Sequence, residues 1–207
     1  MKCALSKLHT GFFRSTGYIE FEGLFSETQI TLLKKISSER LAARSGFDLW
    51  RSSEKVKNLL FSIRPARIAG ELVETSSLRI GFDQPFYGTN DPNTLIPGRT
   101  GSLAETSSLE RVVCAMIVRL DPAPLNEGES PPGLALPQEP GNALFLSPGL
   151  PLIPCRPRNG LYILVVYTSK HTLYRLRRSD PYPYVYKHMG YRPGQQLSDT
   201  THPLLLY

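Results

Sequence analysis

The sequence predicts a layered α+β domain in which helices come first and a pair of antiparallel sheets follows. Two observations lead to this prediction. Apolar residues recur at helical spacing through residues 26–74, and after Ser77 the spacing changes towards the period of two that is typical of strands. The later apolar runs are joined by long loops rich in proline and glycine, whereas a parallel sheet needs helical crossovers between its strands.

Three helices are expected before residue 77. Ser26 and Gln29 have the spacing of a capping box, so a helix begins there and ends at Gly46. A second helix is expected over Ser53–Ile63, where apolar residues form one stripe. Pro65 suits the first turn of a third helix, over Ala66–Glu74.

Strands are expected wherever short apolar runs lie between turn residues. The strongest of them, Arg111–Leu120, is almost continuously apolar, which indicates burial of both faces. The others are residues 17–22, Leu78–Phe82, Ala143–Ser147, Leu161–Tyr167 and Leu173–Arg177. A proline-rich excursion over residues 121–140 interrupts this series, and the tail from Asp180 is rich in tyrosine, proline and glycine.

Length and composition favour one globular domain over residues 1–207, with a mainly helical part (1–76) and a strand core (77–207). No apolar run approaches the roughly 20 residues of a membrane span, and the first residues make a poor signal peptide. Three scattered cysteines indicate a reducing compartment, and we expect a cytoplasmic protein without a membrane partner.

Several stretches resemble one known group of proteins. GYIEFEGLFSETQITLL, from Gly17, is similar to the opening helix of phytanoyl-CoA dioxygenase-like proteins, and Asp48-Leu49-Trp50 looks similar to the start of their next helix. GNALFLSP, from Gly141, resembles the strand that leads to their second iron histidine, and LSDTTHPLLLY resembles a closing segment. The chain also resembles a narrower set of small chlamydial proteins of unassigned activity. The broad resemblance implies a double-stranded β-helix, a cupin-like jelly roll, with N-terminal helices packed on one sheet.

That group consists of oxygenases that use non-haem Fe(II) and 2-oxoglutarate, with two histidines and one carboxylate holding the iron. None of the four histidines here begins a His-x-Asp or His-x-Glu pair. The resemblance places Ala104-Glu105-Thr106 at that pair, leucines at the second histidine, and two arginines near the 2-oxoglutarate anchor. The residues expected at this degenerate pocket, which we call the barrel mouth, are Ala104, Glu105, Thr106, Leu150, Leu152, Arg156 and Arg158.

We therefore expect a non-catalytic protein that binds a small ligand or a protein partner, with no catalytic or metal-binding residue and no cofactor. Leu150 and Leu152 would make the mouth apolar, and Arg156 or Arg158 would anchor an anion. No phosphate loop, nucleophile elbow or His-Glu-x-x-His motif indicates another enzyme class.

Two alternatives stay open. The chain is an active dioxygenase that binds Fe(II) and 2-oxoglutarate through atypical ligands, or it is a basic regulator that responds to nucleic acid or divalent cations. The net charge of +6 and the cluster of Arg175, Arg177 and Arg178 favour the second alternative, because such side chains bind phosphates. Arginines that keep an exposed strand edge from pairing with another chain would give the same pattern.

Overall fold

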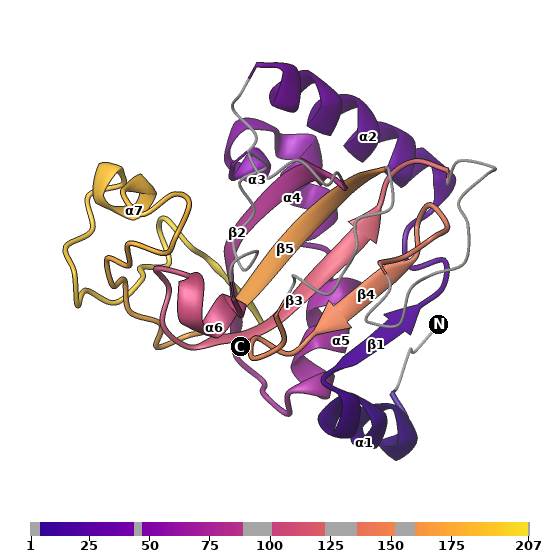
Figure 1. The fold of residues 1–207 in the computed structure, drawn as a ribbon, viewed down its shortest axis with the longest axis horizontal. Coiled ribbons are helices and arrows are strands. Elements are labelled where there is room, and N and C mark those ends of the chain that lie inside the picture. Colours follow the sequence, from indigo (N-terminus) through magenta and orange to yellow (C-terminus); the bar gives the residue numbers. More distant parts are fainter. Residues whose placement is uncertain (1–4, 44–46, 89–100, 123–135, 152–159, 207) are drawn as a thin grey trace.

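A six-stranded antiparallel sheet forms the centre of the fold (Figure 1). The computed structural model describes residues 5–43, 47–88, 101–122, 136–151 and 160–206. The strand order is β1-β4-β3-β5-β2-β6. The strands are β1 (Tyr18–Phe21), β2 (Leu78–Tyr87), β3 (Val112–Arg119), β4 (Ala143–Leu146), β5 (Leu161–Ser169) and β6 (Leu204–Leu206). The antiparallel arrangement predicted from the long connections is confirmed, but the strands within the described residues form one sheet rather than the predicted pair.

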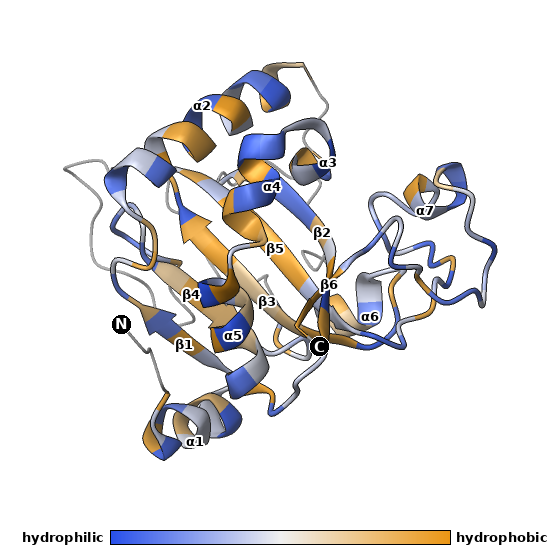
Figure 2. Cartoon of the chain, turned by 180° about the vertical axis from the view of Figure 1, so that it is seen from behind, coloured by the Kyte–Doolittle hydropathy of each residue, from blue (hydrophilic) through white to orange (hydrophobic). Residues whose placement is uncertain are grey.

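Helices from the first part of the chain cover one face of this sheet. Figure 2, which views the sheet from behind, shows three of them, α2, α4 and α5, in front of the strands. The helices of this part are α1 (Lys7–Thr16), α2 (Glu27–Ala42), α3 (Leu49–Ser52), α4 (Glu54–Leu60) and α5 (Ile63–Leu72). Two short helices, α6 (Leu103–Thr106) and α7 (Val185–His188), follow later in the chain.

Both faces of the sheet are buried, and β5 shows this most simply. Its side chains alternate, so that Ile163 and Val165 belong to the hydrophobic cluster under the helices, whereas Leu164 and Val166 belong to a second cluster. The segment that follows β5 covers that second face with the buried tyrosines Tyr174, Tyr186 and Tyr191, while Tyr184 stays exposed. The prediction that Arg111–Leu120 is covered on both sides is confirmed, since nearly all of β3 is buried.

A bulge at Gly81 changes which face the second half of β2 presents. Ile80 pairs with Tyr167 and Phe82 pairs with Val166, so β2 has one residue more than its partner over this step. As a result, Ile80 packs under the helices and Phe82 packs in the second cluster. A Cβ at position 81 would lie 2.9 Å from side-chain atoms of Leu109 and Thr168, which explains the glycine.

Most of the expected elements are present with shifted ends. Ser26 and Gln29 form the predicted capping box, and helices occupy the second and third predicted segments as α4 and α5. The third helix begins at Ile63 rather than Ala66, because Pro65 is accommodated within its first turn. Gly46, the predicted end of the first helix, lies outside the described residues, as does most of the 121–140 excursion.

The predicted strand over Leu173–Arg177 is wrong. Only two isolated bridges form there, from Leu173 to Gln196 and from Tyr174 to Leu109. The segments that pair with these residues, around Leu109 and Gln196, are not strands, so no ladder can extend from them. The alternating pattern instead reflects Tyr174, which is fully buried with its hydroxyl donating to the Pro183 carbonyl. The sequence analysis also missed α1 and β6.

Candidate functional site

The predicted barrel mouth comes together from two segments, α6 and the turn after β4. The amide of Ala104 donates to the carbonyl of Pro148 over 2.9 Å, and Ser102 forms a bridge with Pro151. This contact places Ala104-Glu105-Thr106 beside the turn that carries Leu150. Leu152, Arg156 and Arg158 lie outside the described residues, so their position in the mouth stays a prediction.

The side chains at this mouth are engaged in local structure. The Glu105 carboxylate accepts from the amide and the hydroxyl of Ser102, both over 3.0 Å, and these bonds lower the pKa of Glu105. The buried Thr106 hydroxyl donates to the Ser102 carbonyl over 2.8 Å. Ala104 is exposed and offers no donor atom, and half-buried Leu150 packs with the second cluster. The one carboxylate of the mouth therefore caps its own helix.

The histidines do not supply the missing ligands. Nδ1 of His9 caps α1 by accepting from the Ser6 amide over 3.2 Å, and His171 and His188 are exposed in the tail. His202 is buried, with Nε2 at 2.9 Å from Arg51 and Nδ1 at 3.0 Å from the Tyr191 hydroxyl. Across the described ranges, no three His, Cys, Asp or Glu side chains converge as a metal site would require. These residues do not fit an iron held by two imidazoles and a carboxylate.

The basic cluster of the tail also makes internal contacts. Arg175 is ion-paired with Glu110 over 2.5 Å, and Arg177 donates to the carbonyl of Glu105 over 2.6 Å. Arg178 is exposed. The second of these contacts ties the tail to α6, so nucleic acid would have to compete for Arg175 and Arg177. Nucleic-acid binding by this cluster stays a prediction.

Sequence reasoning missed a group of ionisable side chains, three of them buried and the fourth, Arg51, reaching them from the surface. We call it the interior polar cluster: Asp48, Arg51, Asp83 and His202. Both carboxylate oxygens of Asp83 accept backbone amides, from Leu49 and Trp50, over 3.1 Å each. Arg51 donates to Asp48 over 2.7 Å and to His202 over 2.9 Å. The signal in the sequence was an aspartate within the apolar run of β2.

The contacts of His202 define its protonation. A guanidinium can only donate, so Nε2 of His202 accepts from Arg51 and the ring proton lies on Nδ1, towards the Tyr191 hydroxyl. Burial, together with the charges of Arg51 and Arg79, lowers the pKa of His202 to about 3. Burial, with a further contribution from the charge of Asp48, raises the pKa of Asp83 to about 8. Burial also raises the pKa of Asp48, whereas the charge and the hydrogen bond of Arg51 lower it.

These two shifts predict a specific pH dependence of stability. Asp83 keeps its proton when folded but loses it near pH 4 when unfolded, so its contribution to the free energy of unfolding falls as pH rises from about 4 to 8. His202 has the opposite effect between about pH 3 and 6.5, because the unfolded imidazole is the better base. The two slopes oppose each other between about pH 4 and 6.5. Between pH 6.5 and 8 the free energy of unfolding should fall by about 2 kcal/mol.

Urea unfolding at pH 6.5 and 8 measures this difference. Asp83→Asn should remove most of it, whereas Glu27→Gln, at an exposed carboxylate, should leave it unchanged. Equal pH dependence in Asp83→Asn and the parent protein would show that Asp83 titrates normally.

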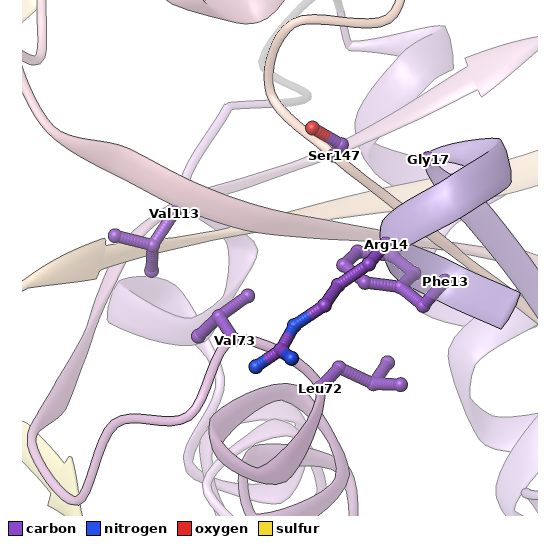
Figure 3. A pocket seen from close by; sticks show the side chains of 7 residues that line it. All are labelled: Phe13, Arg14, Gly17, Leu72, Val73, Val113 and Ser147. Carbon is purple, nitrogen blue, oxygen red and sulfur yellow. The ribbon is translucent and has the colours of Figure 1, made fainter. Parts of the chain in front are cut away.

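A separate pocket lies at the edge of the helix-covered face (Figure 3). Its volume is about 230 Å³. It is lined by Phe13, Arg14, Gly17, Leu72, Val73, Val113 and Ser147. These residues come from α1, the end of α5, the start of β3 and the end of β4. No pattern in the sequence predicts this pocket, because its residues are distant in the chain.

Similarity to known proteins is found at the level of the fold. No protein-family profile matches the sequence, and neither does any curated protein sequence. The non-heme alpha ketoglutarate dependent carbocyclase SnoK from nogalamycin biosynthesis is 16% identical, with a TM-score of 0.69 over 97% of this chain and 96% of SnoK. The chain therefore has the fold of this alpha ketoglutarate dependent enzyme.

Two further structures agree with this assignment. The epimerase SnoN, solved with Fe³⁺, alpha ketoglutarate and nogalamycin RO, is 14% identical, with a TM-score of 0.68 over 96% of this chain and 98% of SnoN. CT296 from Chlamydia trachomatis is 19% identical, with a TM-score of 0.53 over 82% of this chain and 98% of CT296. At these identities the likeness is one of fold. The predicted resemblance to 2-oxoglutarate oxygenases is confirmed to that extent, and the narrower resemblance to chlamydial proteins stays a prediction.

Proposed function

We propose that this chain is a non-catalytic ligand-binding or interaction protein built on a double-stranded β-helix of the 2-oxoglutarate oxygenase type. One observation carries the proposal: within the described residues, none of the four histidines shares a site with two further metal ligands. An oxygenase of this type needs two histidines and one carboxylate on the same iron, so the residues in place do not support its chemistry.

The arrangement of the barrel mouth supports the same proposal. The hydrogen bond from Ala104 to Pro148 brings together the two segments that the resemblance assigns to the iron ligands. The side chains offered there are the methyl group of Ala104, the capping carboxylate of Glu105 and the isobutyl group of Leu150. Such a mouth suits a small apolar or anionic ligand, or a segment of a partner protein, better than a divalent cation.

Iron loading and turnover test the proposal together. Purified protein is incubated anaerobically with Fe(II), desalted, and analysed for bound iron; oxygen and 2-oxoglutarate are then added and succinate is measured. We expect far less than one iron per chain and no succinate above the level without protein. Stoichiometric iron together with succinate formation would establish the active-dioxygenase alternative. The apo and iron-treated samples should also unfold at the same temperature, because a tightly bound metal would stabilise the folded chain.

Among the described residues, a free and buried cysteine, Cys114, supports the expected reducing compartment, for which we propose the cytoplasm. Within the part of the chain that the structure describes, no helix is both long and apolar enough to cross a bilayer.

A further inference from the structure

We propose that the pocket between α1 and α5 binds a small monocarboxylic acid with a short apolar body, whose carboxylate pairs with Arg14. The pocket lies at the edge of the helix-covered face and none of the barrel-mouth residues lines it, so the inference does not depend on the proposed function, although Leu150 packs against the lining residue Gly17. Three properties carry it: the chemistry of the walls, the single cationic group, and the weak hold on that group.

The walls are suited to an apolar ligand body. Four of the lining side chains are hydrocarbon, and they come from three separate elements: Phe13, Leu72, Val73 and Val113. Figure 3 shows Val113 facing Val73 across the pocket, with Phe13 and Leu72 at one side. The volume of about 230 Å³ is smaller than that of a typical drug-sized site, which limits the ligand to a short chain or a single ring.

Arg14 is the one charged side chain lining the pocket, and Ser147 adds a hydroxyl group. Figure 3 shows the Arg14 guanidinium extending from α1 towards Leu72 and Val73. A guanidinium offers paired donors that match the two oxygens of a carboxylate. A cationic group above an apolar floor therefore selects an amphipathic acid over an alcohol or an amine of the same size.

The present partner of Arg14 is easily displaced. Arg14 is ion-paired with Glu74, which follows Val73 directly, and the two side chains are 58% and 62% exposed. Pairs this exposed contribute little to stability, so a ligand carboxylate can replace Glu74 at small cost. Glu74 also has a φ of 53°, a left-handed conformation that side chains other than glycine rarely adopt. This conformation closes the C-terminus of α5, where the amide of Thr75 donates to the carbonyl of Gly70 over 2.9 Å, and it leaves the Glu74 carboxylate beside the pocket.

Titration of the full chain with hexanoate, followed by ¹H–¹⁵N NMR, tests the proposal. We expect saturable shifts of amides around the pocket, with a dissociation constant in the millimolar range or below. Hexanol, the neutral analogue, should bind about tenfold more weakly because it lacks the charge-assisted bonds to Arg14. Val113→Phe should abolish the binding of both compounds by filling the pocket.

The two members of the ion pair give changes of opposite sign. Arg14→Gln should weaken hexanoate binding about tenfold, whereas Glu74→Gln should strengthen it, because Arg14 is then free of its competing carboxylate. Arg175→Gln is the matched control: it removes an exposed arginine from an ion pair with Glu110, and it should change nothing.

Three results would overturn the proposal. They are the absence of saturation up to about 10 mM, equal affinity in Arg14→Gln and the parent protein, and shifts that map to α6 while the amides of α1 and of the end of α5 stay unchanged. The last result would place the ligand at the barrel mouth, so it would support the proposed function while refuting this inference.

Discussion

Replacing Arg119 with methionine should lower the free energy of unfolding by about 3–5 kcal/mol. The side chain is fully buried in β3, and it donates to the carbonyls of Asp121 and Pro122 over 2.7 and 3.3 Å. It also donates to the Pro137 carbonyl over 3.4 Å and to the Tyr162 hydroxyl over 2.8 Å. Methionine has a similar length but no donor, so all four oxygens would lose a hydrogen bond, and those of Pro137 and Tyr162 would lose a buried one. Urea unfolding monitored by circular dichroism measures the loss.

This arginine joins the two ends of the proline-rich excursion. Its acceptors Asp121 and Pro122 precede the excursion's central part and Pro137 follows it, so one side chain closes the loop at its base. Arg175→Met is the control, since an exposed arginine paired with Glu110 should contribute less than about 1 kcal/mol. A similar small loss for Arg119→Met would show that these bonds do not stabilise the fold.

The second large effect is expected at His202, where alanine should cost about 3–4 kcal/mol. The ring is fully buried between two tyrosines, with centroids 5.9 Å from Tyr186 and 5.5 Å from Tyr191. It is also an acceptor for Arg51, so its loss leaves both a cavity and a cation with one partner fewer. Unfolding by urea at pH 7 gives the magnitude.

Hydrogen exchange shows whether this loss is local to the tail. Arg79 donates to the His202 carbonyl and forms an ion pair with Asp199 over 2.8 Å, so the segment around His202 is held from β2 as well as from α3. Amides in residues 198–206 should exchange faster in His202→Ala, because that segment loses its contact with Arg51. His171→Ala, at an exposed position, should change stability by less than about 0.5 kcal/mol. An equal loss of unfolding free energy in His202→Ala and His171→Ala would show that the buried contacts of His202 do not stabilise the fold.

The sequence predicted the central strands because their signal is local. Residues 112–118 and 161–167 are apolar without interruption, and such runs are typical of strands that are buried on both faces. The prediction for β2 stopped at Phe82 because Asp83, Gln84 and Pro85 follow. Each of these is accommodated by a distant contact: Asp83 meets the amides of α3, and Gln84 donates to Tyr182 over 3.0 Å. Pro85 is tolerated because this half of β2 pairs with β5 on one side only.

The helix α1 shows the opposite case, in which the local signal is weak. Only Phe13 is buried among its residues, and Gly11 near its centre lowers the intrinsic helix propensity of the segment. Packing of α1 against α5 and β1 stabilises it, and Gly17 ends it with a φ of 78°. Its beginning was readable, since Ser6 and His9 form a capping box, although histidine is an unusual member of one.

The candidate sites depend on contacts between distant residues, which a single sequence does not encode visibly. The family resemblance placed Ala104 and Leu150 in one mouth, and the structure has the amide of Ala104 bonded to the turn that carries Leu150; the role of this mouth stays a prediction. No such guide existed for the interior polar cluster, whose members lie at positions 48, 51, 83 and 202. The pocket at Arg14 was likewise out of reach, since α1 itself was not predicted.

The most direct test of the central claim is a crystal structure from crystals grown anaerobically with Fe(II) and 2-oxoglutarate, with anomalous data collected at the iron edge. The account predicts no iron peak beside Ala104 and Leu150, and no 2-oxoglutarate chelating a metal there. An iron atom bound by two imidazoles and a carboxylate, at the barrel mouth or elsewhere in the chain, would contradict it.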